Sequence, residues 1–255
     1  MTVSDVLFEA EGPIAIVTLN RPAQLNAINS GIRQGLADAW RRFEQDEALK
    51  VAILTGSGEK AFCAGMDLKE AAATGLRVPP RDFIPVLGDN VHVSKPVIAA
   101  VNGVAYAGGW LFAQMCDLCV ASENAVFAIT EPKVGRGVPW ATPLIHMLPQ
   151  RIVMELLLTA RPLDARRAYE LGYVNAVVPA DRLRATALEL AETIVRNAPL
   201  TVRAARELVY MSTEMGRSAA LRAGRALFEP VYLSEDAQEG PRAFAEKRPP
   251  NWKGR

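Results

Sequence analysis

The sequence has 255 residues, of which 50% are hydrophobic, with 29 lysines and arginines against 28 aspartates and glutamates. A chain of this size and composition can bury a substantial core as one large domain, or as one domain with a small appendage. Because the net charge is only +1, the overall charge gives no reason to expect nucleic acid or an anionic membrane as the main partner.

The N-terminal segment, residues 1–11, carries acidic residues and lacks a basic flank followed by an apolar run, so it does not read as a secretory signal. No stretch approaches the roughly 18 consecutive apolar residues of a membrane span. The sequence therefore predicts a cytoplasmic protein without a membrane partner.

The three cysteines are Cys63, Cys116 and Cys119, an odd number that does not favour a disulfide framework. Cys116 and Cys119 form a C-x-x-C, which could be a redox pair or half of a zinc site. However, this pair lies in an apolar run, there is no second C-x-x-C, and the chain has only two histidines. We interpret these cysteines as small buried hydrophobes and predict no metal site.

The first predicted elements are a β-hairpin and a helix. Apolar residues alternate over residues 6–18 around Gly12-Pro13, which indicates two antiparallel strands. Ser30 is expected to cap a helix whose apolar residues recur at spacings of three and four over residues 32–43.

Two short strands are predicted next, and a mostly helical region follows Pro162. The strands, residues 51–55 and 97–101, each end at a turn that contains glycine. Strands that alternate with helices predict an α/β fold with largely parallel pairing. After Pro162 we predict helices over residues 182–196, 200–211 and 218–227, and one strand within residues 173–178.

Two turns that contain glycine follow strands and open into helices, at residues 62–70 and 102–110. Asp67 and Glu70 form a variant of the capping box, which would begin a helix at Leu68. The backbone amide just before such a helix can face a ligand. The second turn holds Gly108-Gly109 after small residues, which lets a ligand approach the backbone.

Together, two such turns can present amide donors to one oxygen that bears negative charge. Both turns are equally compatible with ordinary tight connections between strand and helix, and the spacing alone does not decide. Neither turn reads G-x-G-x-x-G, and the chain has no G-x-x-x-x-G-K-[ST] motif, so a dinucleotide fingerprint and a phosphate loop are not predicted.

Several ordered segments resemble motifs of the crotonase (enoyl-CoA hydratase/isomerase) superfamily, and they span nearly the whole chain. The similar segments are 20–28 (NRPAQLNAI), 60–70 (KAFCAGMDLKE), 95–103 (KPVIAAVNG) with the following Gly108-Gly109 and Cys116-Asp117, 127–135 (FAITEPKVG) and 244–254 (FAEKRPPNWKG). The resemblance is specific for the superfamily and a poor guide to the reaction within it.

The resemblance implies a crotonase-like spiral of repeated β-β-α units over residues 1–192. It also implies a C-terminal helical trimerisation region over residues 193–255, giving a homotrimer or a dimer of trimers. The implied substrate is an acyl-CoA thioester. Because the CoA is part of that substrate, no separate cofactor is expected.

By position in the motifs, the resemblance places the oxyanion-hole amides at Met66 and Gly108, where they would polarise the thioester carbonyl. A methionine side chain is no obstacle there, since the donors are backbone groups. Lys69 would lie near the CoA phosphates, although it is equally placed to be an ordinary solvated residue. The implied substrate-binding residues are Leu25, Ala27, Ala64, Gly65, Asp67, Leu68, Lys69, Gly109 and Leu111.

The same resemblance identifies Glu131 as the acid/base. Because Glu131 precedes a proline, we expect an extended backbone and a side chain that projects from a strand end. Apolar neighbours such as Leu111 and Trp140 would raise the pKa of this carboxyl toward neutrality. The alternative is a surface carboxylate that pairs with Lys133 or Arg136.

Members of the superfamily that hydrate a double bond typically carry two glutamates, and the first falls at Leu111 in this chain. We predict an enoyl-CoA hydratase/isomerase-type enzyme with Glu131 as its sole acid/base. One alternative is an enoyl-CoA double-bond isomerase without significant hydratase activity, because a lone second glutamate is typical of such isomerases. Another is a non-catalytic CoA-thioester-binding or scaffold protein. An RNA-associated member fits poorly with the near-neutral charge.

Overall fold

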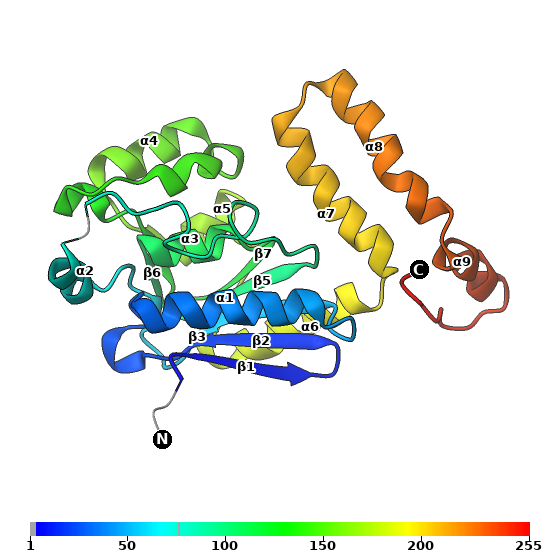
Figure 1. The fold of residues 1–255 in the computed structure, drawn as a ribbon, viewed down its shortest axis with the longest axis horizontal. Coiled ribbons are helices and arrows are strands. Elements are labelled where there is room, and N and C mark those ends of the chain that lie inside the picture. The colour runs from blue at the N-terminus through cyan, green and yellow to red at the C-terminus, as the bar shows by residue number, and fades with distance from the viewer. Residues whose placement is uncertain (1–3, 76) are drawn as a thin grey trace.

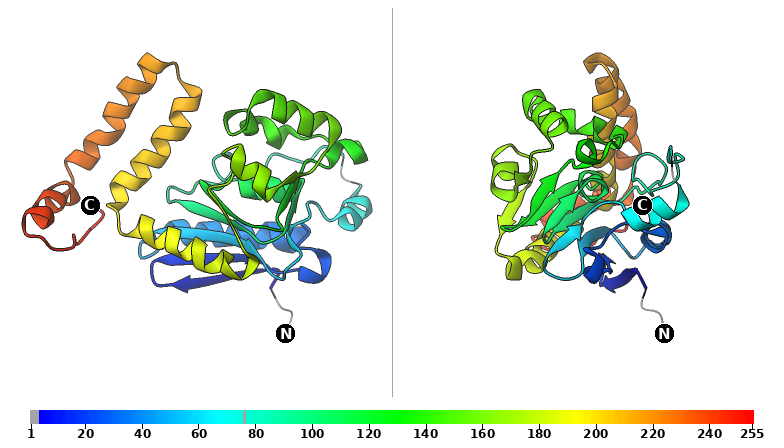
Figure 2. Two further views of the ribbon diagram at one scale, coloured as in Figure 1. Left: turned by 180° about the vertical axis from the view of Figure 1, so that it is seen from behind. Right: turned by 90° about the vertical axis from the view of Figure 1, so that its left-hand side faces the viewer.

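The computed structural model describes residues 4–75 and 77–255 and shows a mixed α/β architecture (Figures 1 and 2). Its larger sheet has the order β1-β2-β3-β5-β7-β10. Strand β1 is antiparallel to β2, and the other pairs in this sheet are parallel. The strands are β1 (Val6–Glu11), β2 (Ile14–Leu19), β3 (Val51–Gly56), β5 (Val97–Val101), β7 (Leu118–Ser122) and β10 (Ala176–Val178).

The smaller sheet has the order β4-β6-β8-β9. Strands β4, β6 and β8 run parallel, and β9 is antiparallel to β8. These strands are β4 (Ala61–Cys63), β6 (Val104–Tyr106), β8 (Val126–Ala128) and β9 (Leu163–Asp164).

Three repeats connect the two sheets. In each repeat, the first strand enters the larger sheet (β3, β5, β7), the second enters the smaller sheet (β4, β6, β8), and a helix follows. The following helices are α2 (Leu68–Thr74), α3 (Gly108–Gln114) and the 3-10 helix η2 (Glu131–Val134). The predicted α/β spiral of β-β-α units is therefore confirmed.

The central strands of the larger sheet, β3 and β5, are buried on both faces. On β3, Ala52 and Leu54 belong to the apolar cluster that contains the core side of α1 (Ser30–Gln45). The alternating residue Ile53 belongs to a second cluster, which includes α6 (Leu183–Val195). Because successive side chains of a strand point to opposite faces, a sheet covered on both sides needs uninterrupted apolar strands.

Helix α1 is capped differently from the prediction. The side chain of Asn29 accepts a hydrogen bond from the Ile32 amide at 2.8 Å, so Asn29 is the N-cap and Ser30 is the first helical residue. At the other end, the buried ammonium of Lys95 donates to three carbonyls, at 2.7–3.1 Å. These carbonyls belong to Phe43, Glu44 and Asp46.

The region after η2 contains more elements than the sequence predicted. The strand expected within residues 173–178 is limited to Ala176–Val178. The predicted helix over residues 182–196 is α6, with ends one residue inside the prediction. The other elements of the chain body are η1 (Pro22–Gln24), η3 (Pro139–His146), α4 (Gln150–Thr159), α5 (Ala165–Glu170) and η4 (Ala180–Arg182).

Three C-terminal helices form an arm that projects from the body (Figure 1). They are α7 (Pro199–Glu214), α8 (Arg217–Tyr232) and α9 (Glu235–Ala245), so the predicted helices over 200–211 and 218–227 are confirmed and longer. The division at residue 192 stays a prediction; α6 runs through that position to Val195. Within the described residues, no helix combines the length and apolar composition needed to cross a bilayer.

The three cysteines are free and buried. Burial raises the pKa of Cys63 and of Cys119 to about 12, and it also raises the pKa of Cys116. Thiols held in the protonated form in apolar surroundings are unreactive. The interpretation of these residues as small buried hydrophobes is confirmed.

Candidate active site

One edge of the smaller sheet brings three predicted site residues together. Strands β4, β6 and β8 are parallel neighbours, so their carboxyl ends lie at the same edge. Met66, Gly108 and Glu131 each follow one of these strand ends by two or three residues. Ligands of open α/β sheets bind at the carboxyl ends of parallel strands, so this edge is the candidate site.

The turn that contains Met66 is held by the segment before α1. The Ile28 amide donates to the Gly65 carbonyl at 2.8 Å, and the Asp67 amide donates to the Ile28 carbonyl at 3.0 Å. This pairing uses the peptide groups on both sides of Met66. Among the described residues, no backbone hydrogen bond uses the Met66 amide or the Gly108 amide as a donor.

Glycines let the two turns approach each other. A Cβ atom on Gly65, whose φ is +94°, would lie 3.6 Å from the Gly108 nitrogen and 2.9 Å from the Ala107 Cβ. A Cβ atom on Gly109 would lie 2.0 Å from the Cys63 carbonyl oxygen. Side chains at these positions would separate the turns, so the glycines keep the Met66 and Gly108 turns in contact.

Ala107, directly before Gly108, has φ +52° and ψ −121°, a conformation that favours glycine. Its amide donates to the Ala128 carbonyl at 2.9 Å, which ties the turn to the last residue of β8. Non-glycine residues held in such conformations cost about 1–3 kcal/mol and cluster at functional sites. The strain at Ala107 marks this turn as one that the surrounding structure holds firmly.

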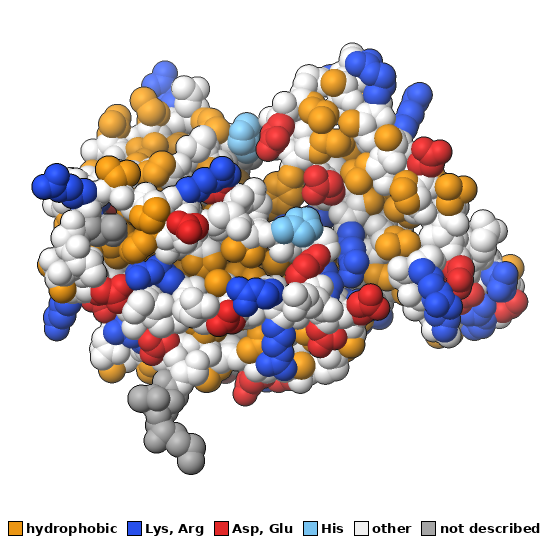
Figure 3. All heavy atoms as spheres, viewed as in Figure 1, with side chains coloured by type: hydrophobic (Ala, Val, Ile, Leu, Met, Phe, Trp, Pro, Cys, Tyr) orange, Lys and Arg blue, Asp and Glu red, His pale blue; other side chains and the backbone are white. Residues whose placement is uncertain are grey.

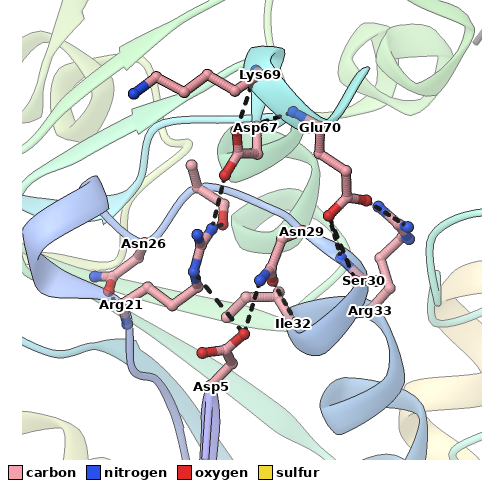
Figure 4. Close-up of polar contacts among 11 residues, drawn as sticks. Asp5, Arg21, Asn26, Asn29, Ser30, Ile32, Arg33, Asp67, Lys69 and Glu70 are labelled. Atoms are coloured by element: carbon pink, nitrogen blue, oxygen red, sulfur yellow. Dashed lines mark hydrogen bonds and ion pairs between the residues drawn. The ribbon is translucent and has the colours of Figure 1, made fainter. Parts of the chain in front are cut away.

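Asp67 fixes the start of α2. Its carboxylate accepts hydrogen bonds from the Lys69 and Glu70 amides, at 3.1 and 3.4 Å, and pairs with Arg21 Nη1 at 3.1 Å (Figure 4). Arg21 Nη1 also donates to the Ala27 carbonyl at 2.7 Å. Burial alone would raise the pKa of Asp67, but the Arg21 guanidinium and the two amides outweigh it and hold the pKa below its usual range.

Glu70 does not complete the predicted capping box. Its carboxylate accepts from the Ser30 amide at 2.9 Å and pairs with Arg33 at 2.8 Å, so it ties α2 to α1 instead of returning to Asp67 (Figure 4). The Arg33 guanidinium also lies 4.2 Å from the centre of the Phe83 ring. The predicted helix start at Leu68 is confirmed, and the predicted reciprocal bond is wrong.

Four of the residues predicted to bind substrate surround this turn. The Ala64 amide donates to the Leu25 carbonyl at 3.0 Å, which aligns the two segments. Leu25 and Leu68 are large hydrophobic side chains that are 40% and 59% exposed. Lys69 is exposed, and its side chain points away from the polar cluster (Figure 4). Contacts of these residues with a CoA thioester stay predictions.

Glu131 is buried, with 8% of the residue exposed. It begins the 3-10 helix η2, so the expected extended strand end is wrong, and the alternative of a surface carboxylate is wrong as well. The Trp140 indole nitrogen donates to Oε1 at 2.8 Å, whereas Oε2 is buried without a hydrogen bond to any described residue. Burial raises the pKa of Glu131, against the opposing effects of the Trp140 hydrogen bond and nearby backbone amides.

Helix α3 packs against η3, the helix whose Trp140 donates to this carboxylate. Leu111, at the position of the first glutamate of hydratases, is buried in the main apolar cluster. Gln114, one turn further along, is also buried and donates to the Trp140 carbonyl at 2.5 Å. Sequence reasoning treated Trp140 as an apolar neighbour and missed both of these hydrogen bonds. A signal was present, because Gln114 is the one polar side chain in the apolar run 110–115.

Asn26 is a second residue that sequence reasoning did not assign. It is fully buried, its Nδ2 donates to the carbonyls of Ser57 and Ala61 at 3.0 and 2.8 Å, and its Oδ1 accepts from the Arg21 amide. Asn26 has φ +56°. It therefore fixes an unusual turn that positions the segment beside Met66. The signal was the polar pair Arg21 and Asn26 within the first family motif.

Two surface grooves lie away from these residues. One, of about 750 Å³, separates α1 from residues 80–92, and the other, of about 270 Å³, separates residues 92–94 from α7 and α8. None of the predicted site residues lines either groove. We therefore locate the candidate site by the sheet edge and its donors.

The sequence matches the family model described as Enoyl-CoA hydratase/isomerase over residues 9–255. The chain belongs to this family. Solved structures agree in fold: an enoyl-CoA hydratase from Mycobacterium tuberculosis is 41% identical, with a TM-score of 0.92 over 99% of this chain and 100% of that chain. An enoyl-CoA hydratase from Mycobacterium marinum is 39% identical, with a TM-score of 0.91 over the same shares.

Curated relatives carry a more specific name. The carnitinyl-CoA dehydratase of Citrobacter koseri is 43% identical over 259 residues, which cover 97% of this chain and 98% of that protein. The carnitinyl-CoA dehydratase of Salmonella typhi is 44% identical over 255 residues, or 96% of each chain. Homologues with these names are lyases, so this chain is an enzyme of the same family.

Proposed function

We propose that this protein is a cytoplasmic lyase that interconverts a 3-hydroxyacyl-CoA and the corresponding enoyl-CoA through an oxyanion-stabilised enolate, with Glu131 as its sole acid/base. The observation that carries this proposal is the shared sheet edge. There, the amides of Met66 and Gly108 share one edge with the buried carboxyl group of Glu131. Among the described residues, neither amide donates a backbone hydrogen bond. The dehydratase names of the relatives support loss of water as the reaction.

In this mechanism the two amides donate hydrogen bonds to the thioester carbonyl oxygen, which lies between them. They stabilise the negative charge that develops when a proton leaves the carbon next to the thioester, and removal of one such donor typically costs about 10²–10³ in rate. Glu131 takes that proton and returns a proton to the departing hydroxyl. A pKa raised by burial suits a group that must both accept and donate a proton near neutral pH.

A second candidate function is double-bond migration without hydration. The observation that favours it is Leu111, a buried hydrophobic side chain where a second glutamate would hold the attacking water. A single carboxyl group suffices to move a proton between two carbons, whereas hydration also requires a positioned water molecule. A non-catalytic CoA-thioester-binding or scaffold protein is the remaining alternative.

The partners in this proposal are an acyl-CoA thioester substrate and further copies of this chain. The CoA moiety belongs to the substrate, and neither a cofactor nor a metal takes part in the steps assigned to Glu131 and the amides. We also propose a homotrimer or a dimer of trimers, supported by hydrophobic side chains exposed along the arm (Figure 3). These include Val209, Leu221, Tyr232, Leu233 and Phe244.

The test is a panel of enoyl-CoA and 3-hydroxyacyl-CoA esters, carnitinyl-CoA among them, assayed with the wild type and with Glu131→Gln. We expect wild-type turnover and a loss of at least about 10²-fold on substitution, with acyl-CoA binding kept within a few-fold. Turnover that survives Glu131→Gln would contradict the proposal. Deuterium uptake or double-bond migration without water exchange would favour the isomerase, and binding without turnover would favour the scaffold.

A further inference from the structure

We propose that Trp140 is a positioning residue that fixes which carboxyl oxygen of Glu131 carries the proton, an inference that rests on the proposed function. The indole nitrogen of Trp140 donates to Glu131 Oε1 at 2.8 Å. An indole nitrogen can donate a hydrogen bond but cannot accept one. A proton on Oε1 would therefore face another donor, so the proton of the neutral acid resides on Oε2.

The second oxygen has no partner within the described part of the protein. Oε2 is buried, and no hydrogen bond joins it to any described residue. A buried polar atom without a partner is costly, and such atoms in native proteins call for a functional explanation. Proton exchange with a substrate would explain the missing partner, because an oxygen that exchanges protons with a substrate must not be hydrogen-bonded within the protein.

Trp140 is itself held in place. It is the second residue of η3, directly after Pro139, whose ring restricts the backbone at the start of that helix. The carbonyl of Trp140 accepts a hydrogen bond at 2.5 Å from Nε2 of the buried Gln114 on α3. The chain Gln114–Trp140–Glu131 thus links the helix that begins at Gly108 to the acid/base.

This arrangement has a consequence for the reaction. If one oxygen both removes and returns protons, the two transfers occur on the same face of the substrate, because Oε2 approaches from one side. The indole also favours the ionised carboxylate, since a hydrogen bond donated to a carboxylate lowers its pKa and opposes the effect of burial. Without the indole, the carboxyl could rotate and would ionise less readily.

A substitution that tests the role of Trp140 should leave the charged and titratable groups on the elements around Glu131 unchanged. The 3-10 helix η2 carries Lys133, and Arg136 follows it. Helix α4, which packs on η2, carries Arg151 and Glu155. The 3-10 helix η3 carries His146, and α3 carries no charged or titratable side chain. A substitution at Trp140 leaves all of these groups unchanged, so a shifted pH profile reports the lost indole hydrogen bond.

The first experiment compares Trp140→Phe with Trp40→Phe. Both replace a tryptophan by a smaller aromatic residue, but the Trp40 indole is buried in α1 with no hydrogen-bond partner among described residues. For Trp140→Phe we expect kcat to fall about 10- to 100-fold, the range for losing a hydrogen bond to a charged group, with KM changed less than about threefold. The acidic limb of its pH profile should move to higher pH, whereas Trp40→Phe should keep the wild-type profile.

The second experiment needs no turnover. Of the four tryptophans in the chain, only the one hydrogen-bonded to Glu131 should show an indole N–H NMR resonance that follows the titration of that carboxyl group. We expect this resonance in the wild type, its loss in Trp140→Phe, and its presence without titration in Glu131→Gln. A Trp140 resonance that ignores pH, or an unchanged kcat and pH profile in Trp140→Phe, overturns the inference. Turnover that survives Glu131→Gln instead overturns the proposed function.

Discussion

Two carboxylates near the candidate site have opposite surroundings. Asp67 pairs with Arg21 and accepts two amide hydrogen bonds at the start of α2, and its pKa is lowered despite burial. Glu131 has one donor, from Trp140, and one buried oxygen without a partner, and its pKa is raised by burial. Full pairing keeps Asp67 ionised, whereas incomplete pairing suits Glu131 for the proton exchange that we propose.

This difference distinguishes a carboxylate that holds the structure in place from one that is suited to proton transfer. A carboxylate whose hydrogen-bonding capacity is largely used by the protein serves as a fixed structural link, here between α2 and the segment 21–28. A carboxyl group that keeps one oxygen unpaired costs stability, and that cost is typical of active sites. Each substitution below changes a carboxyl group of one of these two kinds, either fully paired or incompletely paired.

Among the substitutions that test this contrast through positioning and stability, the largest effect is expected from Asp67→Ala. This substitution removes the N-cap of α2 and one of the two carboxylates that pair with Arg21, although Met66 itself is unchanged. Loss of the cap alone costs about 0.5–2 kcal/mol of stability. Since displacement of a reacting group by about 1 Å can cost 10²-fold in rate, we expect kcat to fall by about that factor.

The matched control is Asp67→Asn, because asparagine is also a favourable N-cap but carries no charge. We expect it to keep most of the helix stability and to lose less activity than Asp67→Ala. The measurements are thermal unfolding and steady-state kinetics. Equal activity losses in both variants would show that the ion pair with Arg21, and not the cap, positions the Met66 turn.

A smaller effect of opposite sign is expected for the stability of Glu131→Gln. Because burial raises the pKa of Glu131 in the folded state, its contribution to stability is complete at acidic pH and is lost as pH rises through the folded pKa. Glutamine has no charge to bury, so at neutral pH this variant should be more stable than the wild type by about 0.5–2 kcal/mol. Denaturant unfolding at several pH values should show the gain disappearing below the usual pKa of glutamate.

The fold was predictable because its signals are local and repeated. Residues 51–55 and 97–101 are apolar on both faces of the strand, and such runs, followed by glycine turns, indicate parallel strands covered on both sides. The cap of α1 was misassigned because Asn29 and Ser30 are adjacent and both suit an N-cap. Only the direction of the Asn29 side chain decides between them.

The family motifs predicted which positions make up the candidate site, but not the contacts among them. The family motifs gave Met66, Gly108 and Glu131, which the sheet places at one edge. They could not show that Trp140 donates to Glu131, because this hydrogen bond depends on how η3 packs against α3. The backbone before Pro132 was expected to be extended, yet Glu131 begins a 3-10 helix, since the preference of residues before proline is weaker than the local packing.

The smallest effect is expected from Glu70→Gln. This variant gives the most direct comparison, because it is the same chemical change as Glu131→Gln. Burial would raise the pKa of Glu70, but the Ser30 amide and Arg33 outweigh it and lower the pKa. Its contribution to stability is therefore present above the unfolded pKa and is lost as pH falls through the folded pKa. At neutral pH we expect Glu70→Gln to destabilise the protein by about 0.5–1 kcal/mol, the range for one hydrogen-bonded, partly exposed ion pair.

The two glutamate-to-glutamine variants should thus differ from the wild type in opposite directions at neutral pH. Both differences should shrink as the solution becomes acidic, because the wild-type carboxyl groups then become neutral, as the glutamines are. Denaturant unfolding of the three proteins over the same pH series measures this directly. If Glu70→Gln were also stabilising at neutral pH, the links from Glu70 to Ser30 and Arg33 would not offset its burial, and the contrast between paired and unpaired carboxylates would fail.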